Sequence, residues 1–173
     1  MGSEMCIRDR SGVDELINRG IADSNNLFIT GGSAGGIATA YAIGLTDRFR
    51  AAVVAKPVIN WVSKVLTADS YIYQIPYQFP GMPWDEYEHY WKRSPLSLVG
   101  NVTTPTMLIT GEDDQRTPIS ETEQFYQALK LRKIDSIMVR VPGSSHGIAG
   151  RPSRLNAKVD NILAWFDRYR SID

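Results

Sequence analysis

A single serine set among glycines is the residue of this sequence best placed to do chemistry. The stretch Gly31-Gly32-Ser33-Ala34-Gly35 matches the pattern G-x-S-x-G, in which a serine occupies a tight turn between a strand and a helix. An apolar run, residues 27–30, precedes the turn, and the run 37–42 after it favours a helix. The glycines leave room for strand and helix to close behind the serine. We therefore expect its hydroxyl to project as a nucleophile, with the N–H groups that begin the helix aimed at a developing oxyanion.

Glycine-rich turns between a strand and a helix also bind phosphate, so that alternative has to be weighed. A dinucleotide-binding loop needs glycine at its first, third and sixth positions, but Ser33 occupies the third. A nucleoside triphosphate loop needs Gly-Lys-Ser/Thr, and no lysine follows here. A purely structural glycine turn stays open on this stretch alone.

A serine becomes a strong nucleophile only when a neighbouring base takes its proton, and the sequence offers two histidines. His89 lies among charged residues on an expected helix, so we interpret it as a solvated side chain. His146 lies in the loop 142–147, directly after an expected strand. A histidine after the last strand of an open α/β sheet can reach a serine turn at the same edge, so His146 is the candidate base.

An acidic group is needed to orient that histidine, and the segment 111–118 supplies it after the third expected strand. The chain order is then serine, acid, histidine, which is the order found in α/β-hydrolases. All three groups would lie at the carboxyl ends of parallel strands, where open α/β sheets place their sites. The pattern alone does not choose between Asp113 and Asp114.

The elements that must position these residues follow from hydrophobic patterning. Four short apolar segments are expected to form strands, namely 27–30, 51–55, 106–110 and 136–141. The absence of polar alternation in 51–55 suits a strand covered on both faces. Helices are expected between or after these strands, over residues 11–23 with Gly20 as a plausible stop, from 37 to about Gly44, over 120–130 and over 155–169. Ser120 and Glu123 are spaced as a capping box. The last helix carries an apolar stripe of Leu155, Val159, Ile162, Leu163, Phe166 and Tyr169. This alternation predicts an α/β fold, a mostly parallel sheet with helices on both faces.

The connection over residues 61–91 is unusually aromatic, since it holds nine of the seventeen aromatic residues of the chain. Prolines at 76, 80 and 83 are expected to break regular structure there. Two interpretations stay open: a connection packed by its own aromatics, or one wall of an apolar substrate pocket. Trp61 is the best candidate for such a wall because it follows a strand.

Composition excludes several other classes of function. The 173 residues are enough for one domain, and 43% hydrophobic with 22% charged residues is ordinary for a globular protein. Lysine plus arginine and aspartate plus glutamate are both 19, so no basic excess indicates nucleic acid. No apolar stretch is long enough to span a membrane, and no signal peptide is visible, so we expect a cytoplasmic protein. The lone Cys6 excludes a disulfide framework and a cysteine-based metal site.

The first ten residues fit none of the expected elements. They lack helical and strand periodicity and resemble translated adaptor sequence, so we interpret 1–10 as a non-native segment and expect Cys6 and Ile7 to pack poorly. The fold is then carried by residues 11–173, and a gene truncated at its 5′ end is expected.

Taken together, the motifs resemble the prolyl oligopeptidase family of serine peptidases, and within it the acylaminoacyl-peptidase-like branch. The resemblance covers nearly all of residues 11–169. It rests on the nucleophile motif 31–36, the block Arg93-Ser94-Pro95-Leu96 with Thr104-Pro105, the acid motif Gly111-x-x-Asp114-x-Arg116-x-Pro118, and Ser145-His146-Gly147. The acid motif selects Asp114 over Asp113.

The resemblance implies hydrolysis of peptide bonds in short peptides through an acyl-enzyme, with no metal or organic cofactor. Ser33 would attack, His146 would move the proton, Asp114 would hold the histidine, and the Ala34 N–H would donate to the oxyanion. Arg116 would reach a substrate carbonyl. Its alternative role is an ion pair with a neighbouring acid.

The sequence departs from the family's pattern at its N-terminal side. Strands that precede the nucleophile strand, the loop with the second oxyanion donor, and the family's β-propeller do not appear. We therefore expect the C-terminal part of a truncated α/β-hydrolase domain, with the nucleophile strand at an open sheet edge, partnered in the parent enzyme by the missing N-terminal part. Such a fragment would be poorly stable, prone to self-association and weakly active at best.

Two rival functions stay open. An esterase acting on small acyl esters would use the same three residues. A non-catalytic fragment that kept the fold is also possible, although intact Ser33, Asp114 and His146 argue against it. The oligomeric state and the choice among acylaminoacyl-, dipeptidyl- and oligopeptidase specificity do not follow from the sequence.

Overall fold

A four-stranded parallel sheet forms the centre of the protein. The structure, a computed structural model, describes residues 11–172. The strands are β1 (Phe28–Gly32), β2 (Ala51–Ala55), β3 (Thr106–Gly111) and β4 (Ser136–Val141), in the spatial order β1-β2-β3-β4. All three pairs are parallel, with Thr30 opposite Val53 in one pair and Leu108 opposite Met138 in another. The predicted parallel sheet is confirmed, and β1 lies at its edge as expected.

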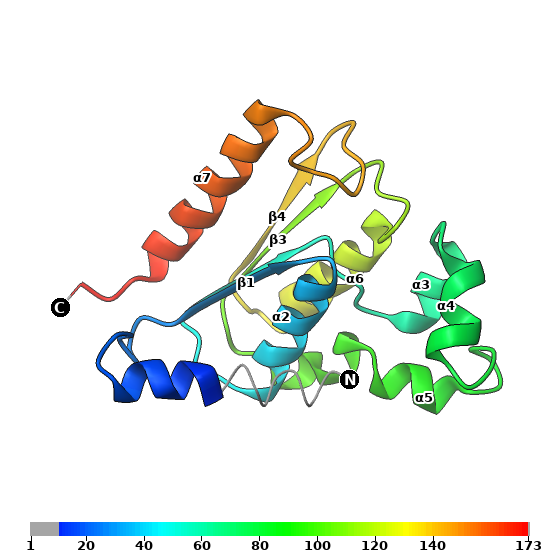
Figure 1. Cartoon of the computed structure of the whole chain (residues 1–173), viewed down its shortest axis with the longest axis horizontal. Coiled ribbons are helices and arrows are strands. Elements are labelled where there is room, and N and C mark those ends of the chain that lie inside the picture. The colour runs from blue at the N-terminus through cyan, green and yellow to red at the C-terminus, as the bar shows by residue number, and fades with distance from the viewer. Residues whose placement is uncertain (1–10, 173) are drawn as a thin grey trace.

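Helices cover both faces of the sheet, as the sequence predicted. Consecutive parallel neighbours need crossover connections of one hand, which puts the connecting helices on one face. On that face lie α2 (Ala34–Leu45), the 3₁₀ helix η1 (Pro95–Asn101) and α6 (Ile119–Leu131), around a core of buried Ala40, Ile43, Val54, Leu108 and Phe125. The other face is covered by α7 (Pro152–Tyr169), whose Trp165 packs with Val53 and Met107. Figure 1 shows α7 on one side of the strands and α2 and α6 on the other.

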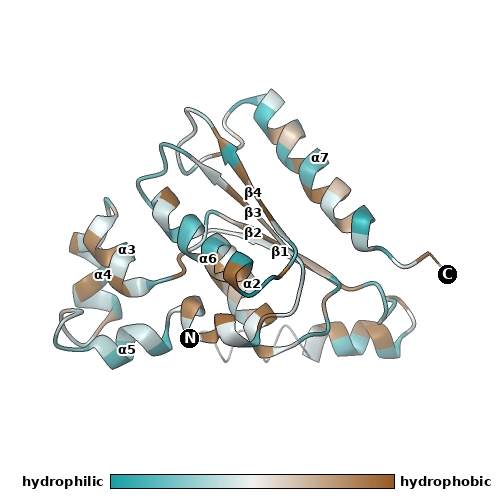
Figure 2. Ribbon diagram, turned by 180° about the vertical axis from the view of Figure 1, so that it is seen from behind, coloured by the Kyte–Doolittle hydropathy of each residue, from teal (hydrophilic) through white to brown (hydrophobic). Residues whose placement is uncertain are grey.

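Only half of the apolar stripe predicted for α7 packs against the sheet. Ile162, Phe166 and Tyr169 pack against the sheet, whereas Leu155, Val159 and Leu163 stay 45%, 44% and 56% exposed. Figure 2 shows hydrophobic and hydrophilic residues mixed along this helix. The three packed residues lie in the C-terminal half of α7, while in its first turn Arg154 donates to the carbonyl oxygens of Pro142 and Gly143.

Two helix ends differ from their predictions. The first helix is seen over residues 11–18 and not as far as 23; it ends at Gly20, the plausible stop, which adopts a left-handed φ of 69° while Ile21 N–H returns to the carbonyl of Leu16. The capping box predicted at Ser120 and Glu123 is wrong. Helix α6 begins one residue earlier, Pro118 occupies the cap position without a side-chain bond, and Glu123 pairs with Arg140 at 3.0 Å.

The aromatic connection folds into three short helices, α3 (Trp61–Thr67), α4 (Tyr71–Gln78) and α5 (Tyr87–Lys92). Pro76 lies inside α4, so the prediction that it breaks regular structure is wrong; near the end of so short a helix it removes only one ladder bond. Phe79 stacks on Tyr90 with ring centroids 4.0 Å apart, and the two form a separate core with Val65. The connection is therefore packed partly by its own aromatics, and Figure 1 shows these helices grouped away from α7.

Two features are absent from the described residues. Over residues 11–172, no helix is long and apolar enough to cross a membrane. Within the same range, no group of three or more histidine, cysteine or acidic side chains is arranged to hold a metal ion. The expectations for Cys6, Ile7 and the rest of 1–10 lie outside the described residues.

Candidate active site

Ser33 occupies a strained turn between β1 and α2. It follows β1 directly, is the N-cap residue of α2, and has φ 59° and ψ −117°, a conformation that side chains rarely adopt. The glycines that flank Ser33 are needed because a side chain at these positions would clash with the backbone. A Cβ on Gly31 would lie 2.3 Å from the Gly35 carbonyl oxygen, and one on Gly36 would lie 2.5 Å from that of Ala55. Only glycine lets strand and helix approach this closely behind the serine.

Three polar side chains from distant parts of the chain form one hydrogen-bonded row. His146 Nε2 lies 3.0 Å from Ser33 Oγ, and His146 Nδ1 lies 2.8 Å from Asp114 Oδ2. Because the carboxylate can only accept, we assign the proton to Nδ1, which leaves Nε2 as the acceptor for the serine hydroxyl. That is the tautomer a general base needs.

Asp114 is held from several sides. Its side chain is fully buried, and Oδ1 accepts from the backbone N–H groups of Arg116 and Thr117, each at 2.9 Å. The Thr117 hydroxyl lies 3.0 Å from Oδ2 and 3.3 Å from His146 Nδ1. Asp113, the alternative that the bare pattern left open, is exposed. The structure therefore brings Asp114 and not Asp113 to the histidine.

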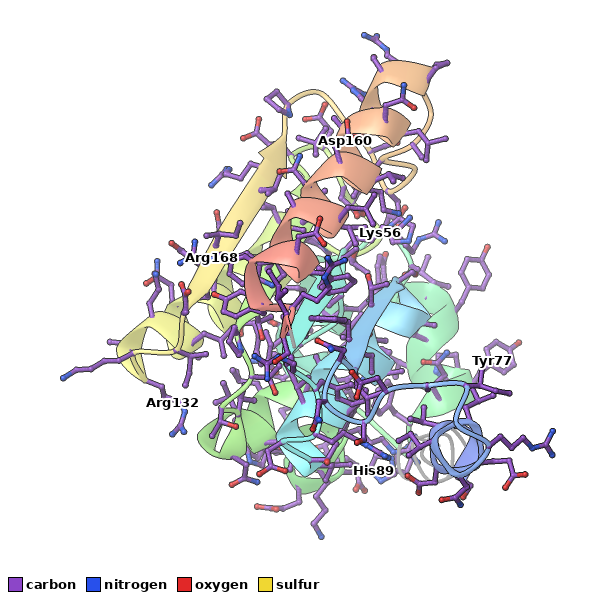
Figure 3. The ribbon with its side chains drawn as sticks, turned by 90° about the vertical axis from the view of Figure 1, so that its left-hand side faces the viewer. Lys56, Tyr77, His89, Arg132, Asp160 and Arg168 are labelled. Carbon is purple, nitrogen blue, oxygen red and sulfur yellow. The ribbon has the colours of Figure 1, made fainter. Side chains whose placement is uncertain are left out.

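The histidine loop is fixed against the ends of the central strands. A Cβ on Gly111, the last residue of β3, would lie 2.1 Å from the carbonyl oxygen of Ser144, so loop and strand touch through backbone. Lys56, which follows β2, donates from Nζ to the carbonyl oxygen of His146 at 2.6 Å. Figure 3 shows this lysine beside α7. Burial, with help from the nearby Lys158 ammonium, lowers the pKa of Lys56, while Asp114 opposes that shift.

Sequence reasoning missed Lys56 and Thr117. One signal could have found Lys56: it is a charged residue directly after a buried strand. That strand, β2, lies between the strand that carries Ser33 and the strand that precedes the acid loop. Thr117 lay inside the acid motif without being singled out. Lys56 also has a left-handed φ of 41°, a conformation that costs energy in a residue other than glycine.

A pocket of about 650 Å³ opens beside the serine. Its walls come from the start of α2, from α3 and α4 and from the acid loop, and the lining includes Ser33, Ala34, Trp61, Phe79 and Arg116. The structure thus places Trp61 in the wall of a cavity, where its ring also packs on Phe79. Ala34 is the first residue of α2, so its N–H has no acceptor within the helix.

Arg116 forms the ion pair that was its alternative role. Its guanidinium donates twice to Asp69, at 2.7 and 3.3 Å, and its side chain is 56% exposed. The pair lowers the pKa of Asp69 and raises that of Arg116. Because Arg116 also lines the pocket, the ion pair orients the guanidinium at the pocket wall.

His89 takes no part in this site. Figure 3 shows it well separated from Lys56, which contacts the histidine loop. The interpretation of His89 as a solvated side chain is wrong: it is half-buried, its ring meets Phe79 edge-on, and its Nε2 is buried without a hydrogen-bond partner among the described residues.

A serine on a strained strand-to-helix turn, with histidine and aspartate after two further strands of a parallel sheet, places the protein in the α/β-hydrolase fold class. The chain belongs to the prolyl oligopeptidase family, whose model matches residues 6–172.

Similar proteins carry peptidase names. The uncharacterized peptidase YuxL of Bacillus subtilis is 36% identical over 160 residues, which are 91% of this chain and 24% of that protein. The acylamino-acid-releasing enzyme of Arabidopsis thaliana is 33% identical over 167 residues, 91% of this chain and 22% of that enzyme. The chain therefore spans about a quarter of the length of these curated relatives.

Solved structures of the same kind superpose well. The acylaminoacyl peptidase of Pyrococcus horikoshii gives a TM-score of 0.83 at 26% identity and covers 94% of this chain and 28% of that one. A puromycin-hydrolyzing peptidase of Mycobacterium tuberculosis gives a TM-score of 0.84 at 28% identity, over 94% of this chain and 24% of that one. Both likenesses support the same α/β-hydrolase fold.

Proposed function

We propose that this chain is the C-terminal part of the catalytic domain of a serine peptidase that cleaves short peptides through an acyl-enzyme. The observation that carries the proposal is the row from Ser33 Oγ through His146 to Asp114, at 3.0 and 2.8 Å, at the edge of a substrate-sized pocket. Family membership and the peptidase names of the relatives support it.

Each group has one task in the proposed reaction. Ser33 Oγ attacks the carbonyl carbon of the scissile bond while His146 Nε2 takes the proton of the serine hydroxyl. The resulting oxyanion accepts a hydrogen bond from the N–H of Ala34. As the tetrahedral intermediate collapses, His146 returns the proton to the leaving amine and the acyl-enzyme remains. Water, deprotonated by the same imidazole, then releases the acid and restores the serine. Asp114 stays ionised, holds the tautomer and stabilises the imidazolium.

The pocket beside Ser33 would bind the peptide. Trp61 and Phe79 offer an apolar wall, and Arg116 offers N–H donors to a substrate carbonyl while Asp69 holds it. The names of two relatives, acylaminoacyl peptidase and acylamino-acid-releasing enzyme, support a substrate whose acyl side is an acylated amino acid. The rest of a longer parent enzyme, as the family resemblance implies, would supply the second oxyanion donor and the substrate filter.

A serine-directed fluorophosphonate probe tests the proposal on the full-length protein that carries this chain. Wild type should be labelled, Ser33→Ala should not, and Ser145→Ala, which alters an exposed serine beside His146, should be labelled like wild type. A folded wild-type protein that takes up no probe would overturn the proposal. Competing hydrolysis of an aminoacyl anilide and a short-chain ester then separates a peptidase from an esterase that uses the same residues.

A further inference from the structure

A buried lysine lies in the wall of the same pocket. Lys64 of α3 is only 1% exposed, yet it lines the cavity that opens beside Ser33. Its Nζ donates to Ser70 Oγ at 2.8 Å and to Gln74 Oε1, both neutral oxygens. An ammonium group has three N–H donors, so one remains after these two bonds.

No carboxylate in the described residues forms an ion pair with Lys64, although two lie in its neighbourhood. Asp69 is bound by Arg116. Glu121, buried under α3, accepts the backbone N–H groups of Ile59 and Asn60 at 2.9 and 2.8 Å. Both acids are therefore hydrogen-bonded to other groups, and they stabilise the charge of the ammonium only from a distance.

A buried ammonium without an anion is costly, which is why such groups usually have a partner. Burial and the charge of Arg116 lower the pKa of Lys64 to about 8, while Asp69 and Glu121 oppose the shift. The group is thus still largely charged near neutral pH.

The charges of the pocket wall all have one sign. Lys64, Arg93 and Arg116 line the cavity, and none of its lining residues within 11–172 is an aspartate or glutamate. The Trp61 ring lies with its centroid 5.9 Å from Lys64 Nζ, and Tyr77 of α4, which also lines the cavity, is exposed at the surface (Figure 3). The pocket therefore offers a cation at its wall and an apolar surface beside it.

The geometry also indicates which part of a substrate enters. The leaving amine has to meet His146, since that imidazole protonates it, and His146 is not among the lining residues. Ser33 and Ala34 are, so the pocket receives the acyl side of the scissile bond.

We propose that Lys64 determines specificity by pairing with a carboxylate side chain on the acyl side of the scissile bond, so that the enzyme prefers peptides with glutamate or aspartate there. The inference rests on the proposed function. The carboxylate would take the third N–H of the ammonium, and the methylene groups of the substrate side chain would pack on Trp61.

The test compares two peptide anilides that differ only in glutamate against glutamine next to the scissile bond, with the full-length protein. A charge-assisted hydrogen bond of about 1.5–3 kcal/mol predicts that wild type cleaves the glutamate peptide about 10- to 150-fold better in kcat/KM. Lys64→Met should bring this ratio near one while the glutamine peptide is cleaved within a few-fold of wild type. Lys92→Met, an exposed lysine of α5 outside the pocket, should keep the wild-type ratio.

The pH dependence of the preference for glutamate over glutamine in wild type is a second test, because a lysine with a purely structural role would not change that preference. The preference for glutamate should fade as pH rises through about 8, because the ammonium loses its proton, and the effect of His146 cancels in the ratio. The groups that face Lys64 are Arg116, Asp69 and Glu121 among charged residues, with neutral Ser70 and Gln74.

Equal cleavage of the two peptides by wild type would overturn the inference, even if Lys64→Met failed to fold. A glutamate preference that survives in Lys64→Met would overturn it too, and would leave the lysine as a tie between α3 and α4. Cleavage of neither peptide by wild type would overturn the proposed function and this inference with it.

Discussion

Replacement of Lys56 by methionine tests how the proposed base is held in place. The change keeps the length of the side chain and removes the ammonium that donates to the His146 carbonyl at 2.6 Å. Lys56 does not line the pocket, so substrate contacts stay intact. The expected defect is in the position of the imidazole and not in binding.

The size of the effect follows from that one bond. A hydrogen bond from a charged donor contributes about 1.5–3 kcal/mol, and the partial exposure of Lys56 argues for a reduced value of about 1–2 kcal/mol. If loss of this bond makes the reactive position of the loop less favourable by about 1–2 kcal/mol, kcat falls about 5- to 30-fold. KM should change less than twofold.

Steady-state kinetics on an aminoacyl anilide measure both constants, with two matched variants beside Lys56→Met. Lys56→Arg keeps a donor and should recover most of kcat. Lys158→Met removes the neighbouring ammonium without touching the histidine loop and should behave like wild type. Since the pKa of Lys56 lies below its usual 10.5, wild type should also lose activity at alkaline pH in a step that Lys56→Met lacks.

Wild-type kcat in Lys56→Met would refute the reasoning, because the loop would then be held by its backbone contact with β3 alone. A rise in KM with unchanged kcat would refute it as well, since it would place Lys56 in substrate binding. The groups that face this ammonium are Asp114, His146 and Lys158, and only the first two belong to the proposed machinery.

Three further outcomes follow from contacts described above. Thr117→Val should lower kcat about two- to tenfold, because the Asp114 carboxylate loses the hydroxyl donor but keeps its two backbone N–H donors, and Thr117→Ser should keep activity in the same anilide assay. Glu121→Ala should lower the free energy of unfolding by about 2–4 kcal/mol, since two backbone N–H groups lose their acceptor, while Glu123→Ala on the exposed side of the same helix should change it by about 0.5 kcal/mol or less in urea titrations. Equal losses in the two glutamate variants would contradict this. Gly111→Ala should cost about 1–3 kcal/mol and weaken fluorophosphonate labelling by displacing the histidine loop, whereas Gly100→Ala, with open space around it, should do neither.

The sheet and the order of the candidate groups were accessible from the sequence. Apolar strands without alternation indicate burial on both faces, and parallel strands bring their carboxyl ends to one edge. Residues that directly follow such strands, Ser33 and the acid loop, then had to meet there. The choice of Asp114 over Asp113 needed more, because the turn after β3 buries one carboxylate and exposes the next, and local pattern does not encode that difference.

The lysines show what sequence pattern could not give. Burial of Lys64 depends on α4 folding over α3, and the contact of Lys56 depends on a loop 90 positions later in the chain. Local rules also failed where tertiary structure outweighed them, as at Pro76 inside α4 and at Glu123, which meets Arg140 instead of capping α6.

The wide spacing of the proposed reacting groups has a consequence for synthesis. Ser33 and its partner His146 are 113 positions apart, so a growing polypeptide completes the nucleophile turn long before its imidazole exists. While these 113 positions are being synthesised the hydroxyl would have no base, and hydrolytic activity would arise only once the fourth strand has joined the others. Delayed assembly would thereby keep the nascent chain inactive until its last strand is in place.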